Sequence, residues 1–83
     1  METTIEVNQN VSVKQKMSDI LLDISVAKIS MKYFDKSRSW LYHKLDGIDG
    51  NGKPTDFSAE EKEQLRNALK DLSNRISTCA DKL

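Results

Sequence analysis

The chain has 83 residues, of which 37% are hydrophobic and 31% charged, and its formal net charge is zero. This size and composition predict one small globular domain with a thin core, and they argue against several domains or a disordered chain. A single cysteine excludes an intramolecular disulfide and a cysteine-based zinc site within one chain, and no apolar run reaches the roughly 20 residues of a membrane span.

Residues 1–10 are polar and lack periodicity, so we expect a flexible tail followed by a single helical domain over residues 11–83. The tail lacks the basic and then apolar pattern of a signal peptide, so a cytoplasmic protein is expected. Helical spacing of apolar residues predicts a first helix over about 11–24. An uninterrupted helix to Lys28 is the alternative, because no glycine or proline marks a boundary, but a break near residues 23–25 is favoured. The apolar residues are Val13, Met17, Ile20, Leu21 and Ile24.

Two short helices are predicted next, over 26–34 and 38–45. Ser25 and Ser37 supply side-chain oxygens that can cap them, and Asp46-Gly47 can end the second. The second helix is amphipathic, since one face carries Trp40, Leu41 and Leu45 and the other Arg38, Ser39, Tyr42 and His43. We expect Trp40 to be a core anchor rather than half exposed on a protein-binding surface.

This pair of helices has the arrangement of a helix-turn-helix. The run from Asp35 to Gly47 resembles the turn and recognition helix of repressor-type DNA-binding domains. Two departures stand out. Asp35 replaces the usual turn glycine, or Phe34 does if the turn is one residue shorter, and Ser30 matches the usual small residue only with a turn one residue longer. The matching residues are Ser37, Arg38, Ser39, Leu41, Leu45 and Gly47.

A second resemblance covers roughly Ile29 to the C-terminus. The run SRSWLYHKLDG, followed by NGKP and a leucine-rich helix, is similar to a family of small uncharacterised bacterial helical proteins. That resemblance implies no established activity.

The positive charge of the chain is concentrated in the same region. Residues 28–45 hold five lysines and arginines against Asp35 alone, whereas the flanking segments are acidic or balanced. A local basic patch is what phosphate contacts require. The pattern predicts DNA contacts, with bases or phosphates, from Arg38, Ser39, Tyr42, His43, Lys32, Lys36 and Lys44.

The segment 47–57 contains all three glycines and the only proline, which predicts an exposed loop with tight turns. Asp49-Gly50-Asn51-Gly52 suits a calcium loop poorly, because Gly47 and Ser58 would stand where acidic ligands belong. No metal or other cofactor is expected. We also expect no enzymatic activity, since the sequence has no nucleophile triad, phosphate-cradling loop or clustered metal ligands.

The last predicted helix spans about 58–81. Ser58 and Glu61 form a capping box, and apolar residues then follow at heptad spacing. This seam can pack within the chain or pair with a second copy. Because a helix of about 36 Å is longer than the first helix can cover, a homodimer is favoured, and Cys79 is expected to be a buried apolar residue. The seam consists of Leu65, Leu69, Leu72, Ile76, Cys79 and Leu83.

The sequence therefore predicts an all-α, four-helix compact domain with a helix-turn-helix core and a long C-terminal helix. The first functional hypothesis is a small DNA-binding protein, acting on double-stranded DNA as a regulator. The rival is a helical protein-interaction or assembly module without a nucleic-acid role, because fold alone does not fix function.

Overall fold

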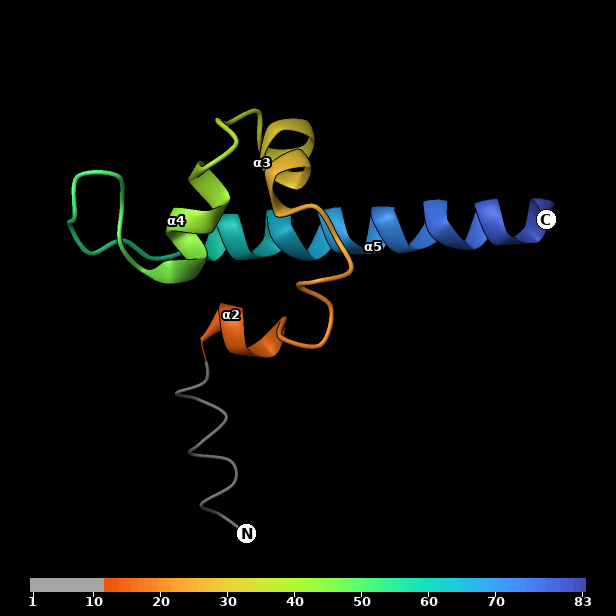
Figure 1. The fold of residues 1–83 in the computed structure, drawn as a ribbon, viewed down its shortest axis with the longest axis horizontal. Coiled ribbons are helices and arrows are strands. Elements are labelled where there is room, and N and C mark those ends of the chain that lie inside the picture. The colour runs from red at the N-terminus through yellow and green to blue at the C-terminus, as the bar shows by residue number, and fades with distance from the viewer. Residues whose placement is uncertain (1–11) are drawn as a thin grey trace, which may run out of the picture.

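The computed structural model describes residues 12–83 and is all-α, as predicted. In this part of the chain the helices are α2 (Val13–Lys16), α3 (Val26–Phe34), α4 (Trp40–Asp46) and α5 (Ala59–Lys82). Helix α5 forms one straight rod, with α3 and α4 on one side of it in the view of Figure 1 and α2 on the other. The predicted tail over residues 1–10 lies outside the described residues, as does Val11.

The prediction of a first helix over 11–24 is wrong in length. Helix α2 ends at Lys16, and residues 17–23 form successive turns, with Ile20 N–H donating to the Met17 carbonyl at 2.9 Å and Asp23 N–H to that of Ile20 at 2.9 Å. The turns let one short segment contact two helices, since α2 packs on α4 while Ile20 and Ile24 lie against α5. A straight helix would keep its apolar stripe on one line.

The break near residues 23–25 is confirmed, and Ser25 caps α3 by accepting a hydrogen bond from Lys28 N–H at 3.2 Å. Helix α3 ends at Phe34, and the C-cap residue Asp35 has a left-handed backbone conformation with φ of 56°. Ser30, which has no exposed surface, donates from Oγ to the Ser37 carbonyl at 2.6 Å. A buried side chain thus fastens the turn between α3 and α4.

Helix α4 begins at Trp40, two residues later than predicted, and the prediction that Ser37 caps it is wrong. Ser39 occupies the N-cap position without a side-chain cap, while the Ser37 carbonyl accepts from Trp40 N–H at 3.2 Å and from Ser30 Oγ. The hydrogen bond from Ser30 thus holds the backbone of Ser37 in the turn. Gly47, with φ of 80°, ends the helix as predicted.

The segment after α4 folds back on itself as a hairpin-like loop. Ile48 and Pro54 form an isolated antiparallel bridge, and the Asp49 carboxylate accepts from the backbone N–H groups of Asn51 and Lys53 at 2.8 and 2.9 Å. These hydrogen bonds lower the pKa of Asp49, with that from Lys53 contributing most. Asp49 therefore organises the turn.

Helix α5 has the predicted capping box. Ser58 Oγ accepts from Glu61 N–H at 3.0 Å, and the Glu61 carboxylate accepts from Ser58 N–H at 2.9 Å. The same carboxylate lies 3.1 Å from Lys44 Nζ, and the Lys44 ammonium also donates to the Asp56 carbonyl at 2.8 Å. Lys44 thereby ties α4 to the start of α5.

The core lies where α3, α4 and the first half of α5 meet. Leu41 is its centre, with no exposed surface. Along the predicted seam burial falls steadily, because the other helices do not reach the second half of α5 (Figure 1). Leu65 is buried and Leu69 and Leu72 are half-buried, whereas Ile76 and Leu83 are exposed. Cys79 is exposed as well, so the expectation that it is buried is wrong within one chain. The core residues are Met17, Val26, Ile29, Phe34, Leu41, Leu45, Phe57, Leu65 and Ala68.

Replacing Ser30 with alanine removes the hydrogen bond to the Ser37 carbonyl at a fully buried position. We expect the free energy of unfolding to fall by about 1 kcal/mol, the usual net worth of such a bond. Urea titration followed by the fluorescence of Trp40, the only tryptophan, measures the change. The control is Ser77→Ala at an exposed position in α5. Equal stabilities of the two variants would show that the turn does not depend on this bond.

A second prediction concerns pH and Glu61. Partial burial raises its pKa, but the hydrogen bond from Ser58 N–H and the pairing with Lys44 outweigh burial and leave the pKa below its ordinary value. The ionised carboxylate therefore stabilises the fold above the unfolded-state pKa of about 4.5, and this contribution is lost as pH falls through the lower folded-state pKa.

Glu61→Gln keeps a capping side chain but removes the charge. We expect this variant to be less stable than the wild type at pH 7, and the difference to shrink as the pH falls below the ordinary glutamate range. Urea titrations at several pH values compare the two proteins. A difference that stayed constant with pH would contradict stabilisation by the ionised Glu61 carboxylate.

Candidate functional site

The predicted DNA-contacting residues lie on and around the turn between α3 and α4. In Figure 1 this turn stands at the upper edge of the molecule, on the side of α5 opposite α2. Lys36, Arg38, Ser39 and Tyr42 are all exposed there, and Tyr42 retains 48% of its accessible surface. Because Ser30 fixes the turn from beneath, this strip is an exposed polar surface on a rigid support.

Trp40 lies at the boundary of this strip, and its side chain is half-buried. Its ring packs on Phe34 with centroids 4.9 Å apart, so it extends the core, as predicted. The ammonium groups of Lys36 and Lys44 lie 5.7 and 5.6 Å from the centroid of its ring. Such cation–π contacts hold both lysines against the indole.

Two of the predicted residues are engaged in contacts within the chain. The Lys44 side chain is only 16% exposed because it pairs with Glu61. His43 is half-buried beneath the hairpin-like loop, where a Cβ added to Gly50 would lie 3.4 Å from its Cε1 atom. The loop therefore lies close to the imidazole. The side chains of Lys44 and His43 are therefore less accessible to solvent, and to DNA, than the side chain of Arg38.

Lys32 is the predicted residue that stands apart. It lines a hollow of about 250 Å³ together with Lys28 of α3 and Arg75 of α5. The concentration of charge in residues 28–45 is therefore divided between two surfaces. One lies at the α3–α4 turn and the other between α3 and α5.

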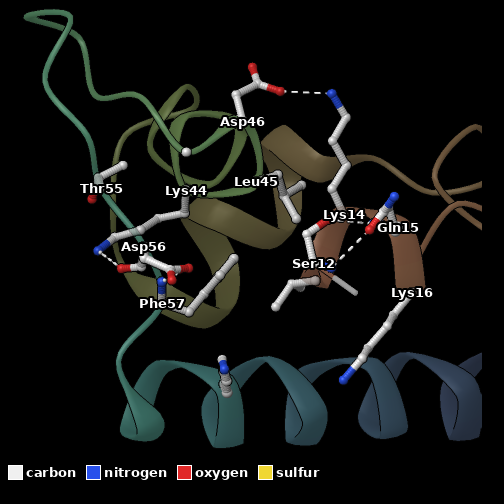
Figure 2. A pocket seen from close by; sticks show the side chains of 13 residues that line it. Ser12, Lys14, Gln15, Lys16, Lys44, Leu45, Asp46, Thr55, Asp56 and Phe57 are labelled. Atoms are coloured by element: carbon white, nitrogen blue, oxygen red, sulfur yellow. Dashed lines mark hydrogen bonds and ion pairs between the residues drawn. The ribbon is translucent and has the colours of Figure 1, made fainter. Parts of the chain in front are cut away.

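A hollow of about 830 Å³ lies between α2, α4, the segment before α5 and α5 itself (Figure 2). Figure 2 shows an ion pair at one side of it, where Lys14 Nζ lies 2.9 Å from Asp46 Oδ1. Lys16 and Lys62 also line it, with Phe57 as an apolar wall. The sequence does not predict this hollow, because no pattern of residues along the chain indicates that α2 packs on α4.

The hollow has no constellation for catalysis, since lysines, paired acids and backbone make up most of its polar lining. Among residues 12–83 no three histidine, cysteine or acidic side chains are grouped so that they could hold a metal ion. No helix in the described range is long and apolar enough to cross a membrane. The exposed strip at the start of α4 therefore remains the candidate site.

Comparison with known proteins gives a family but no activity. No curated protein and no solved structure matches the chain significantly. The family model described as a domain of unknown function, DUF5053, matches residues 13–83, which include all four described helices. The chain therefore belongs to the DUF5053 family.

Proposed function

We propose that this protein binds double-stranded DNA through the helix-turn-helix-like pair α3 and α4. The observation that supports the proposal best is the exposed strip at the start of α4, which combines Lys36 and Arg38 with the polar side chains of Ser39 and Tyr42. The N-terminal residues of a recognition helix are those that contact base edges in the major groove. Side chains of these types contact phosphates and bases.

The roles follow from what each side chain can reach. Arg38 is the only arginine of the strip and can bind guanine with two hydrogen bonds, while Ser39 and Tyr42 can donate to a base or a phosphate. Lys36 supplies a phosphate contact beside Trp40. With the net charge zero, we expect few phosphate contacts and modest affinity.

Binding to a random duplex should weaken as salt increases. Two phosphate contacts, each contributing a slope of about −0.9, predict a loss of about tenfold in affinity between about 50 and about 200 mM salt. Fluorescence anisotropy of a labelled duplex measures this. Reversing both charges in K36E/R38E should abolish binding at either salt concentration. The matched control K62E/K70E changes the net charge equally at exposed positions of α5 and should retain most of the binding.

Two results would contradict the proposal. One is the absence of binding at low salt, and the other is an equal loss in both double variants, which would indicate an effect of net charge alone. The rival function, a protein-interaction module, predicts indifference to salt and to the K36E/R38E change. The exposure of Ile76, Leu83 and Leu22 favours this rival as a second candidate.

A further inference from the structure

The turns between α2 and α3 expose a leucine between two acids. Leu22 is 99% exposed, and Asp19 and Asp23 beside it are exposed too. Among residues 12–83 neither carboxylate forms an ion pair. We call Asp19, Leu22 and Asp23 the acidic turn. A fully exposed leucine between two unpaired acids has the chemistry of a small docking element.

A hollow of opposite charge lies between α3 and α5. We call it the basic hollow, and its volume is about 250 Å³. Lys28, Lys32 and Arg75 supply its charges, and Ile29, Tyr33 and Leu72 its apolar surface. Its wall is held in place, because Arg75 donates to Tyr33 Oη at 3.0 Å and Tyr33 Oη donates to Asp71 at 2.5 Å.

The acidic turn and the basic hollow are opposite in charge, and each includes apolar side chains. A leucine side chain is small enough to enter the hollow, and carboxylates on either side of it would meet ammonium groups of Lys28 and Lys32. Neither lysine forms an ion pair within residues 12–83. Leu22 is exposed to solvent and does not line the basic hollow of its own chain. The basic hollow can therefore receive a leucine only from another molecule.

We propose that the occupant of the basic hollow is the acidic turn of a second copy of this chain. The two elements lie next to each other, because Ile24 and Ser25 join them and a second hollow of about 260 Å³ shares Leu72 with the basic hollow. That second hollow includes Asp23 and Ile76. Because the two patches are adjacent, two copies related by a two-fold axis can each place the acidic turn in the basic hollow of the other. Such a reciprocal contact gives a closed dimer.

This contact differs from pairing of the α5 seam alone. In the exposed half of α5 the seam is flanked by Arg75 and Lys82, which line a third hollow, of about 350 Å³. Self-pairing of that half would bury the apolar seam without engaging Lys28 and Lys32, whereas the acidic turn brings carboxylates to the basic hollow. The inference does not rest on DNA binding, because it uses Lys28 and Lys32 rather than Lys36 and Arg38.

Charge exchange between two variants tests the proposal. D19K/D23K makes the acidic turn basic, and K28E/K32E makes the basic hollow acidic. Each variant alone should dimerise at least about tenfold more weakly than the wild type, since both of its contacts become like-charge contacts. In an equimolar mixture the heterodimer regains both contacts, so dimerisation should return. Sedimentation velocity measures all four samples, and circular dichroism verifies that the variants are folded.

L22S is the matched control for the apolar part of the contact. It should weaken dimerisation without changing the helical content, because Leu22 is exposed in the monomer. A wild-type protein that remains monomeric at about 1 mM, the weak end of specific association, overturns the proposal, and so does a mixture of charge variants that does not dimerise. A dimer unaffected by either reversal would instead indicate pairing through α5. An open series of larger species would exclude the two-fold arrangement.

Discussion

The hydrogen bond from Ser30 Oγ to the Ser37 carbonyl is the contact on which the arrangement of α3 and α4 depends. It joins the middle of one helix to the turn before the next, at a position with no exposed surface. The left-handed Asp35 directs the chain back at that point. Once the turn is fixed, Leu41 enters the core and the side chains at the start of α4 are presented at the edge of the molecule. Because the donor Ser30 has no exposed surface, its hydroxyl has no access to bulk water, and the bond to the Ser37 carbonyl favours one geometry of this turn.

Helix α5 provides the support for the rest of the protein through its first half only. Its capping box and the pair between Lys44 and Glu61 join the helix start to α4, and Leu65 and Ala68 complete the core. Beyond Leu72 the other elements no longer cover it. A chain of 83 residues buries only a modest core, and three of its exposed apolar residues, Leu22, Ile76 and Leu83, lie in the α2–α3 turns and along the second half of α5.

The two proposals use different surfaces of one small domain. The DNA-binding strip belongs to the α3–α4 turn, while the contact between copies belongs to the other side of α3, facing α5. Lys32 was grouped by sequence with the DNA-contacting residues, but the structure places it with Lys28 and Arg75. A helix has several faces, so basic residues that are close in sequence need not act on the same partner.

The sequence by itself determined the elements that local chemistry specifies. The capping box at Ser58, the cap at Ser25 and the glycine stop at Gly47 predicted three helix boundaries, because such hydrogen bonds and backbone conformations involve residues a few positions apart. Tertiary structure decided the rest. The segment 17–24 has a helical apolar pattern, yet it forms turns after α2, which packs on α4, and these turns bring Ile20 and Ile24 to α5. Helix α4 begins at Trp40, so Ser37 lies in the turn and accepts a bond from Ser30 at its backbone carbonyl. Lys44 pairs with Glu61 and leaves little of its side chain exposed on the predicted DNA surface. Each of these outcomes depends on burial or on a partner that is close in space but distant in sequence, which periodicity along the chain does not encode.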